Sequence, residues 1–466
     1  MHPHVWSLYF DFLERFRCLT YRGVPIALFC YFPHYTTHIT HLIKKDTFIK
    51  HLNHYPLSRE DFQPYYNRFL PRANKDETFR AGETEERKVV FFDDYLRFTK
   101  DTYRNHFNPT RTFILSELHH RRYKGFAVRN IQSFQANVDD WIETYQSRAQ
   151  QIIERLGWHP FFGDYSFQSR LIKLDIPLII RGLDAAFRLF KQIPVACVVT
   201  GGTATNVKLN AILPIVASMK GIPSISLQHG IIGADRGWLP VVTTKQAVYG
   251  EYEKIYYRQA GVPETQLEIV GHPRFDAIFE REHMGRREFC DRYKMDPAAK
   301  TVLITTQSVW HPNQLKSLIE HLSRYPVNIM VKLHPLEKKD RYNEIKQQYS
   351  FVRFFNSECH LYDLMANTDI AIVFFSTTGL ETLLFDKPVI YMLPTSAGGA
   401  PYQYSPHFVQ KNPKIIADMA HRLATDDSYA ELARRERVRY LSKAYPEKQS
   451  AKKLSQLIEQ LSGGRP

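Results

Sequence analysis

The chain has 466 residues, which is long for a single hydrophobic core, so two domains are expected. Hydrophobic residues make up 44% and charged residues 24%, a globular composition that excludes a chain disordered over most of its length. The formal net charge of +14 favours anionic partners such as phosphates. No module typical of nucleic-acid binding accompanies this charge, so we predict no nucleic-acid partner.

The sequence favours a cytoplasmic protein. Its five cysteines lie far apart without a CxxC pair, which fits a reducing compartment and gives no metal-type spacing. The N-terminus lacks the pattern of a signal peptide, and the longest apolar runs, such as 24–32, are far shorter than the roughly 20 residues that span a bilayer. We expect at most a peripheral contact with the inner face of the cell membrane. The basic stretch 433–445 is a candidate for that contact, although a solvated helix face explains it equally well.

The first half of the chain becomes more regular as it proceeds. Over the first 160 residues the pattern predicts a strand at 25–32, a helix at 38–50, strands at 89–92 and 112–115, and a long helix at 130–156. Strands and helices then alternate: helix 171–191, strand 195–200, helix 206–220, and strands 224–227 and 246–249. This alternation predicts βαβ units and a parallel sheet.

The second half follows a charged, helical connector at 279–293. Predicted strands lie at 301–305, 328–331, 352–355, 370–375 and 388–392, and predicted helices near 313–323, 337–348, 360–367, 378–385 and 413–424. Nearly continuous apolar strands between amphipathic helices are typical of a sheet covered on both faces. We therefore predict an N-terminal, acceptor-side domain at 1–285 with an irregular extension, and a nucleotide-binding domain at 286–466 whose last helices could pack back on the first.

Four short motifs each follow an apolar run that has the pattern of a strand. They are Gln-His-Gly at 228–230, Gly-His-Pro-Arg-Phe-Asp at 271–276, Lys-Leu-His-Pro at 332–335 and Ser-Thr-Thr-Gly-Leu-Glu at 376–381. In open α/β sheets, ligands bind beyond the carboxyl ends of the strands. Motifs in both halves of the chain therefore predict a ligand cleft between two α/β domains.

The 376–381 motif is the strongest candidate for an anion site. Ser376, Thr377 and Thr378 lie where a strand passes into a helix, and the free N–H groups of a helix start attract phosphate. Glu381 could accept a hydrogen bond from a ribose hydroxyl. The competing interpretation is a capping box formed by Thr378 and Glu381.

His334 and Lys332 form the second candidate for donor binding. Pro335 forces His334 out of the helical region, so the strand ends abruptly and the imidazole projects from its tip. With Lys332 beside it, His334 could contact a phosphate or protonate a leaving group. A surface histidine with no ligand is the alternative.

In the first half, His229 stands between Gln228 and Gly230, and glycine permits a strained turn there. Facing an acceptor hydroxyl, His229 could act as a general base, unless it is a loop histidine bonded only to backbone. We place Gln228, Gly230, Gly202 and Thr203 on the acceptor side.

Two further residues are candidates for donor binding. Arg274 could clamp a phosphate or form a salt bridge between domains, and Gln307 follows the first strand of the second half.

The chain contains no D-x-D pair, no Walker A sequence, no G-x-G-x-x-G and no G-x-S-x-G. We therefore predict no metal and no cofactor, and kinase, dehydrogenase and serine-hydrolase functions lose their support.

At these motifs the chain resembles bacterial surface-polysaccharide glycosyltransferases of the GT-B superfamily, a group that includes capsule-synthesis transferases and CDP-glycerol glycerophosphotransferases. The resemblance spans about 194–394 and is carried by SLQHGIIG, VYGEYEKIYYRQAGVPETQLEIVGHPRFD, VKLHP and FFSTTGLETLLFDKPVIYM. It implies an α/β fold of two Rossmann-like domains facing a central cleft. The nucleotide is then held mainly by the C-terminal domain.

The resemblance also implies roles for single residues. The His-Pro and Ser-Thr pairs resemble those of sialyl- and Kdo-transferases, which implies that His334, Ser376 and Thr377 contact the donor phosphate. The Gln-His-Gly sequence resembles the His-Gly of glycerophosphotransferases, which implies that His229 is the base. Two departures stand out: Asp93-Asp94 is followed by Tyr95 rather than glycine, and the SLQHG loop lacks a Pro-Leu-Lys continuation.

The resulting prediction is a metal-independent glycosyltransferase. It moves a sugar from a nucleotide-sugar donor to a glycan or lipid-linked glycan acceptor of a bacterial surface polysaccharide. Two alternatives share the fold, a CDP-alditol polyol-phosphate transferase and an isomerase of the UDP-GlcNAc 2-epimerase type. A third alternative is a basic scaffold that binds anionic polymers without catalysis.

Overall fold

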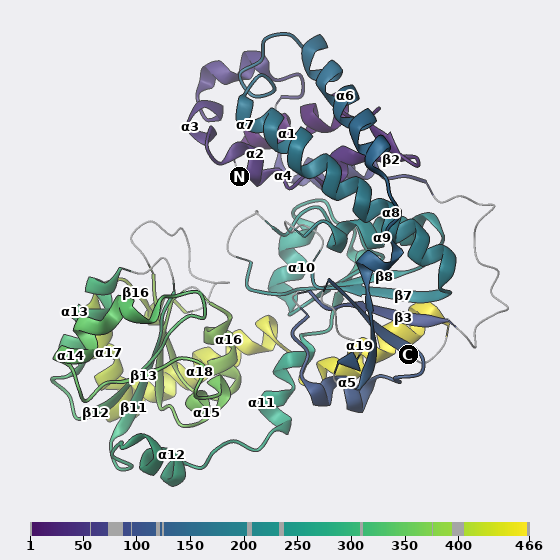
Figure 1. Ribbon diagram of the computed structural model, residues 1–466. Coiled ribbons are helices and arrows are strands. Elements are labelled where there is room, and N and C mark those ends of the chain that lie inside the picture. Colours follow the sequence, from purple (N-terminus) through teal and green to yellow (C-terminus); the bar gives the residue numbers. More distant parts are fainter. Residues whose placement is uncertain are drawn as a thin grey trace. The chain divides into compact units, whose positions relative to one another are not determined.

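The computed structural model describes residues 2–55, 57–72, 87–94, 96–117, 122–123, 125–202, 207–232, 237–307, 311–374, 376–393 and 405–463. The chain forms two compact units (Figure 1). Unit 1 comprises 1–229, 234–274 and 449–466, and unit 2 comprises 230–233 and 275–448. The acceptor-side and nucleotide-side roles predicted for 1–285 and 286–466 stay predictions.

Unit 1 is built on an eight-stranded sheet of order β10-β9-β8-β7-β3-β4-β6-β5, in which only the short edge strand β5 runs antiparallel to its neighbour. The strands are β3 (Lys88–Phe92), β4 (Thr112–Ser116), β5 (Arg122–Tyr123), β6 (Phe126–Asn130), β7 (Val195–Thr200), β8 (Ser224–Leu227), β9 (Lys245–Val248) and β10 (Leu267–Ile269). The strand order reverses between β3 and β7, and such a reversal is where open α/β sheets bind ligands.

The helices of unit 1 include an N-terminal layer that the sequence pattern did not resolve. They are α1 (Pro3–Arg15), α2 (Pro33–Thr36), α3 (Thr40–Ile43), α4 (Arg59–Asn67), α5 (Lys100–His106), α6 (Asp139–Arg155), α7 (Tyr165–Ser169), α8 (Ile176–Gln192), α9 (Leu209–Met219), α10 (Glu251–Arg258) and α19 (Ser450–Ser462). The strand predicted at 25–32 is wrong. A two-residue hairpin, β1 (Thr20–Tyr21) with β2 (Val24–Pro25), leads into a 3-10 helix at Ile26–Phe29, because a short, fully apolar run does not distinguish strand from helix.

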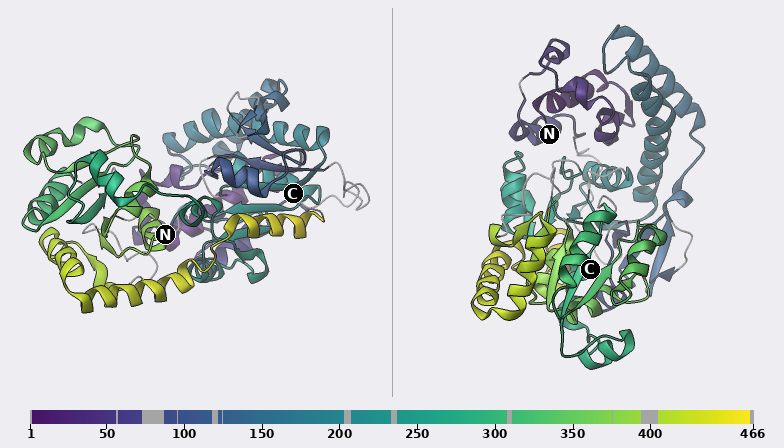
Figure 2. Two further views of the ribbon diagram at one scale, coloured as in Figure 1. Left: turned by 90° about the horizontal axis from the view of Figure 1, so that it is seen from below. Right: turned by 90° about the vertical axis from the view of Figure 1, so that its left-hand side faces the viewer.

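The last helix of the chain belongs to unit 1. Leu454, Leu457 and Ile458 of α19 join the core formed by the inner strands, where Phe91 and Val199 also lie. The helix contacts α5 and β7, and Figure 2 shows it running along unit 1 near the C-terminal end of the chain. The helix α19 therefore forms part of unit 1.

Unit 2 has a fully parallel six-stranded sheet of order β13-β12-β11-β14-β15-β16, which is the 3-2-1-4-5-6 order of a doubly wound fold. The strands are β11 (Lys300–Thr305), β12 (Val327–Lys332), β13 (Arg353–Phe355), β14 (Ile370–Val373), β15 (Val389–Met392) and β16 (Val409–Gln410). The helices are α11 (Ala277–Glu280), α12 (Arg286–Tyr293), α13 (Pro312–Leu322), α14 (Asn343–Gln348), α15 (Leu361–Ala366), α16 (Thr377–Leu384), α17 (Pro413–Thr425) and α18 (Asp427–Ala444). The strand order reverses between β11 and β14.

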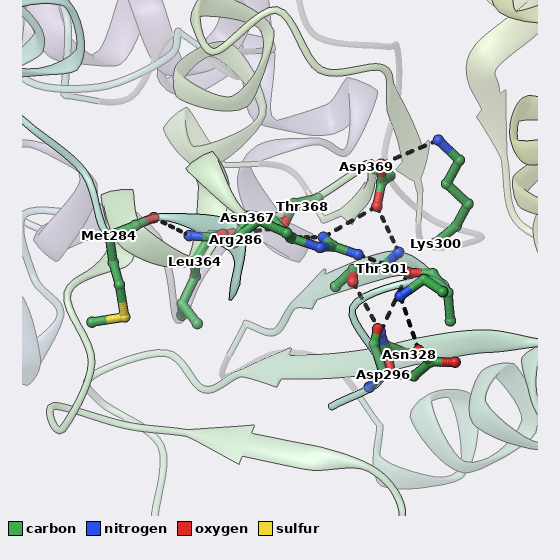
Figure 3. A network of polar contacts seen from close by, with 12 residues as sticks. Met284, Arg286, Asp296, Lys300, Thr301, Asn328, Leu364, Asn367, Thr368 and Asp369 are labelled. Atoms are coloured by element: carbon green, nitrogen blue, oxygen red, sulfur yellow. Dashed lines mark hydrogen bonds and ion pairs between the residues drawn. The ribbon is translucent and has the colours of Figure 1, made fainter. Parts of the chain in front are cut away.

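A polar network fastens the amino edge of this sheet (Figure 3). Asp369, just before β14, accepts hydrogen bonds from the backbone of Thr301 at 2.8 Å and contacts Arg286 of α12 at 3.3 Å. Arg286 also donates to the carbonyls of Asn367 and Ala299. Because these bonds join the starts of β11 and β14 to α12, they fix the two strands whose opposite ends form the reversal point.

None of the helices in the described part of the chain combines the length and the hydropathy of a membrane-spanning segment.

Candidate active site

The carboxyl ends of β11 and β14 in unit 2 bring a buried threonine of β11 against the Ser-Thr-Thr motif. Thr305, the last residue of β11, is buried, and its hydroxyl lies 3.2 Å from the Thr378 hydroxyl in the first turn of α16. This contact spans the reversal point of the sheet. The predicted Ser-Thr-Thr motif therefore lies where the strand order favours a ligand.

Ser376 begins α16 as its N-cap. Its hydroxyl accepts a hydrogen bond from the backbone N–H of Thr378 at 3.3 Å. The alternative capping box between Thr378 and Glu381 is wrong, because the helix starts at Thr377 and both residues are inside it. The positive end of the helix dipole at this start favours an anion. Glu381 lies further along the helix and is 5% exposed.

Gly379 is required by packing inside unit 2. A Cβ atom added at Gly379 would lie 2.3 Å from the hydroxyl oxygen and 2.6 Å from the ring of Tyr391, a buried residue of β15. The glycine therefore lets the first turn of α16 lie directly against the sheet.

His334 follows β12, and its ring orientation is fixed by the backbone. Its Nδ1 atom accepts a hydrogen bond from the N–H of Leu336 at 3.2 Å. A ring nitrogen that accepts has no proton, so a neutral His334 carries its proton on Nε2. The side chain thus presents an N–H donor, which is the polarity that contact with a phosphate oxygen needs.

Glu337 holds this loop in place, and the sequence analysis missed it. Its carboxylate is fully buried and accepts the backbone N–H of His334 at 2.9 Å and the Tyr342 hydroxyl at 2.6 Å. The Thr306 hydroxyl also donates to it, and Arg341 pairs with it at 3.2 Å. Its position three residues after His334 matches the spacing of a capping box, which is the signal that could have identified it.

The two remaining donor candidates of unit 2 lie beside this loop. Lys332 ends β12, and burial lowers the pKa of its ammonium group, with Glu358 and Cys359 acting in the opposite direction. Its carbonyl accepts a hydrogen bond from the Thr306 backbone at 3.0 Å. Gln307 follows Thr306 and is partly exposed.

The reversal point of unit 1 lies between β3 and β7. Beyond β7 the chain continues into Gly201 and Gly202, and Gly202 has a φ of 126°, which favours glycine. Beyond β8 comes His229, whose ring stacks on Trp238 at 4.7 Å between centroids and 17° between planes. A hydrogen bond joins the His229 ring to the backbone of Gly201. The structure therefore brings His229 and the Gly201–Gly202 loop together.

The surroundings of His229 favour a neutral imidazole. Burial lowers its pKa to about 4, and the positive charges of Arg97 and Arg274 act in the same direction, while the bond to Gly201 opposes them. That opposing effect identifies the Gly201 carbonyl as the acceptor, so one ring nitrogen donates to it. A neutral imidazole then has its lone pair on the other nitrogen, as a general base needs.

His272, Arg274 and Arg97 extend this group. His272 is fully buried, and its Nδ1 atom accepts the N–H of Arg274 at 3.2 Å. Burial lowers the pKa of His272 well below its usual value, and Arg274, His229 and Arg97 lower it further. The sequence analysis missed Arg97, whose φ of 51° is unusual for a side-chain-bearing residue. Such backbone strain is common near functional sites.

Two carboxylates lie at the ends of the neighbouring strands. Asp94, after β3, accepts a hydrogen bond from the Asn210 amide at 2.9 Å, and burial raises its pKa. Burial also raises the pKa of Glu117, after β4, and the charge of Asp94 adds to the effect. The sequence showed Asp93-Asp94 directly after a strand, a placement that could have identified Asp94.

Gln228, predicted on the acceptor side, has its side chain buried beside β9 and α10. Its side chain is 1% exposed, donates to Glu253 at 3.2 Å and accepts the backbone N–H of Tyr249 at 3.1 Å. Glu253 in turn caps α10 through the N–H of Gly250 at 3.0 Å. Gln228 therefore ties the end of β8 to β9 and α10, and it orients the following residue, His229.

The predicted site residues fall into two groups. Lys332, His334, Ser376, Thr377, Thr378, Glu381 and Gln307 lie in unit 2, whereas Gln228, His229, Gly202 and Arg274 lie in unit 1. Gly230 is in the short segment assigned to unit 2 and is partly exposed. Asp276 lies buried at the start of α11, and Thr203 lies outside the described residues.

The fold of the chain is GT-B-like. UDP-GlcNAc 2-epimerase from Neisseria meningitidis, bound to UDP-GlcNAc, has a similar structure with a TM-score of 0.51 at 12% identity, covering 80% of this chain and 98% of that one. Anabaena Alr3699/HepE in complex with UDP-glucose matches with a TM-score of 0.48 at 13% identity over 81% of this chain and 99% of that one. The wall teichoic acid polymerase TagF matches with a TM-score of 0.48 at 10% identity over 93% of this chain and 98% of that one.

Residues 247–460 match the model of the family CDP-glycerol:poly(glycerophosphate) glycerophosphotransferase. This range is slightly less than half of the chain and includes the motifs of unit 2. No curated protein matches the sequence significantly. The family match supports a transferase, and the solved structures show the fold alone.

Proposed function

We propose that the chain transfers a group from a nucleotide donor to a hydroxyl of a bacterial surface polymer. The observation that carries this proposal is the placement of two polar groups beyond the carboxyl ends of the strands that flank β11 in unit 2. His334 offers Nε2–H beyond β12, and α16 offers the positive end of its helix dipole beyond β14. Such a set suits the phosphates of a nucleotide.

In this proposal the leaving nucleotide is stabilised without a metal. Its negative charge is met by His334, by the hydroxyl of Thr377 and the N-terminus of α16, and by Lys332 beside them. Arg274 is retained as a donor-binding residue, and Gln307 and Glu381 are retained for the nucleoside. Glu337 acts as a positioning residue, because it fixes the backbone from which His334 projects.

His229 is the proposed general base. In glycosyl transfer it takes the proton of the acceptor hydroxyl, whose oxygen bonds to the anomeric carbon. The bond between that carbon and the phosphate oxygen breaks, and the nucleoside phosphate leaves with the electron pair. Gln228 keeps His229 in place, and the Gly201 carbonyl sets its tautomer.

Polyol-phosphate transfer from a CDP-alditol is the second candidate, and the family match over 247–460 favours it. In that reaction the acceptor oxygen attacks the phosphorus next to the alditol. The bond between this phosphorus and the CMP oxygen breaks, and CMP leaves. The two candidates therefore differ in the bond that is cut and in the donor from which the nucleotide is released.

The acceptor in this proposal is a glycan or lipid-linked glycan of the cell envelope, such as a capsule polysaccharide. The support is the resemblance in sequence together with the positive net charge of +14, which favours an anionic polymer or membrane surface. Arg435 and Arg439 on the exposed side of α18 are the proposed points of contact with the inner face of the membrane.

The released nucleotide tests the proposal. The purified protein is incubated with CDP-glycerol, UDP-glucose, UDP-GlcNAc or a CMP-sugar, with and without a surface polymer, and the nucleotides are separated by chromatography. Release of CMP from CDP-glycerol only when polymer is present supports the second candidate. Polymer-dependent release of UDP from a UDP-sugar, or of CMP from a CMP-sugar, supports glycosyl transfer.

The same experiment identifies the remaining alternatives. Conversion of UDP-GlcNAc without polymer indicates an isomerase. Absence of turnover with all donors, together with polymer binding that survives His229→Ala and His334→Ala, indicates a scaffold and contradicts the proposal.

A further inference from the structure

A pocket of about 170 Å³ opens at the edge of the unit 2 sheet opposite the donor motifs. It lies at the amino ends of β11, β14 and β15, against the turn between α17 and α18. Its polar lining comes from Lys300, Asp369, Arg434 and Arg437. The remaining lining is apolar and mostly small, with Ile370, Pro388, Leu423, Ala424, Ala430 and Ala433. The pocket therefore has a charged side and an apolar side.

Arg437 lines this pocket and carries a buried hydrogen-bond donor without an acceptor among the described residues. Its two terminal nitrogens contact Asp386, through the carboxylate at 3.2 Å and the carbonyl at 2.5 Å. Its Nε atom is buried and finds no acceptor among the residues that the structure describes. A buried donor without an acceptor costs free energy, so an arginine in this state calls for a ligand oxygen or a water.

Positive charge exceeds negative charge around the pocket. Lys300 lies 3.5 Å from Asp369, which Arg286 already contacts (Figure 3). Lys387, next to Pro388, adds a further cation, and burial lowers its pKa while Arg286 and Lys300 lower it further. Among the residues that line the pocket, three cations, Lys300, Arg434 and Arg437, accompany one carboxylate, that of Asp369. This lining suits an anion such as a phosphate.

The size of the pocket limits the ligand. Sites for drug-sized molecules have volumes of roughly 300–1,000 Å³, so a pocket of about 170 Å³ does not hold a nucleotide. It has room for one phosphate group and a few carbon atoms. Arginine binds phosphate oxygens with planar, directed N–H groups, and the alanines provide an apolar surface for the carbon part.

We propose that this pocket binds a small phosphate monoester, with its phosphate on Arg437 and Lys300 and its carbon part on the alanines of α17 and α18. The site is separate from the donor site, because the two lie at opposite ends of the same parallel strands. The Asp369 network joins the pocket to the starts of β11 and β14, whose far ends carry Thr305 and the Ser376 cap. The proposal does not depend on the function proposed above.

Isothermal titration of the full chain with glycerol 3-phosphate tests the proposal, with glycerol as the uncharged control. Ala430→Leu fills the pocket and keeps every charge, and Arg437→Gln removes the free donor. We expect each variant to bind glycerol 3-phosphate about tenfold more weakly. Arg437→Gln loses one charged hydrogen bond, and Ala430→Leu loses the space for the carbon part of the ligand. Lys443→Gln, an exposed position on the same helix but outside the pocket, and His334→Ala, in the donor site, are expected to bind glycerol 3-phosphate as the native protein does.

The phosphate could belong to a soluble molecule or to a lipid headgroup. Sedimentation with phosphatidylcholine vesicles, with and without phosphatidic acid, separates the two sources. Phosphatidic-acid-dependent binding that is lost in Ala430→Leu, without binding of glycerol 3-phosphate, identifies the lipid source. Thermal midpoints within about 3 °C of the native value confirm that the variants are folded.

Two results overturn the proposal. One is binding of neither glycerol 3-phosphate nor phosphatidic acid vesicles. The other is binding that Ala430→Leu and Arg437→Gln leave unchanged. If that binding is lost in His334→Ala, the ligand binds in the donor site.

Discussion

His229 combines partial burial, two neighbouring arginines and a bond to the Gly201 carbonyl, and together these keep its imidazole neutral. Its pKa of about 4 lies well below neutral pH. His334 is fixed by a different means, because a backbone N–H donates to its Nδ1 atom. The two predicted histidines are thus prepared for opposite tasks, since His229 offers a lone pair and His334 offers a proton donor.

The pH dependence of turnover tests the role of His229. A base with a pKa of about 4 stays deprotonated until the pH falls to about 4, so we expect kcat/KM to hold down to about pH 5. The His229→Ala variant is expected to lose at least about a hundredfold in kcat, the lower end of general-base effects. An acid limb centred near pH 6.5, or a fully active His229→Ala variant, would contradict this role.

The same pKa predicts an acid-sensitive fold. Between pH 6.5 and about 4 the unfolded chain protonates residue 229 while the folded protein does not, so the free energy of unfolding falls as the pH falls through this window. The lowering of the pKa from 6.5 to about 4 corresponds to about 3 kcal/mol of stability that is lost on acidification. In His229→Asn residue 229 does not titrate, so we expect that variant to lack this loss. Urea unfolding of both proteins at pH 7 and pH 4.5 measures it. Equal losses of stability in the two proteins would show that His229 does not titrate in this way.

Gly379 gives a prediction about packing at the start of α16. A methyl group there would contact the Tyr391 hydroxyl at 2.3 Å, whereas Gly285, at the start of α12, has no atom within 4 Å of an added Cβ. We expect Gly379→Ala to lower the free energy of unfolding by about 1–3 kcal/mol and Gly285→Ala to leave it nearly unchanged. Thermal or urea unfolding of the two variants compares them directly. Equal stability of both would mean that α16 can move away from β15 at little cost.

At the level of elements, the loop after β12 depends on one buried carboxylate. Glu337 accepts from the backbone of His334, from Thr306 and from Tyr342, and it pairs with Arg341. Glu337→Gln replaces two of its acceptor positions by a donor, so we expect a loss of about 2–4 kcal/mol in stability and weaker nucleotide binding. Glu344→Gln, an exposed position on α14, is the matched control. Unchanged nucleotide affinity in a folded Glu337→Gln variant would contradict the positioning role.

The elements also show what could be predicted from the sequence. Strands β11, β12, β13, β14 and β15 of unit 2 and strands β3, β4, β7 and β8 were predicted within about two residues, because long βαβ units repeat one hydrophobic pattern. The 3-10 helix at Ile26–Phe29 and strand β6 were not, because the first is a short apolar run and the second is a half-exposed strand near the sheet edge. Local pattern does not determine either case.

The candidate site was predicted to a similar extent. Motifs at strand ends indicated His229, His334 and Ser376, because strand ends are visible in the sequence. Arg97 and Glu337 were missed, since their importance depends on what the fold places beside them. Gln228 was identified, but its side-chain amide forms hydrogen bonds with Glu253 of α10 and with the backbone after β9. No local sequence pattern reveals these contacts.

At the level of the whole molecule, the last helix of the chain, α19, packs into the core of unit 1, which is otherwise formed by residues between 89 and 270. Leu454 and Ile458 of α19 are fully buried in the core of unit 1, more than 250 residues after β7. Leu454→Ala is expected to destabilise unit 1 by about 2–5 kcal/mol, whereas Leu461→Ala, at a partly buried position of the same helix, costs less. Hydrogen exchange of β3 and β7 measures the effect within unit 1. Unchanged protection of these strands in Leu454→Ala would show that α19 contributes little to this core.

The central claim is that unit 2 binds the phosphates of a nucleotide through His334 and the start of α16. The most direct test is the thermal stability of the purified protein with CMP, CDP, UDP, GDP or dTDP at equal concentrations, since a ligand of the folded state raises its stability by mass action. His334→Ala and Ser376→Ala are compared with His407→Ala, an exposed histidine of the same unit. We predict a rise in Tm with a cytidine or uridine nucleotide that the first two variants lose and the third keeps. No rise with any nucleotide, or a rise that His334→Ala and Ser376→Ala retain in full, would contradict the account.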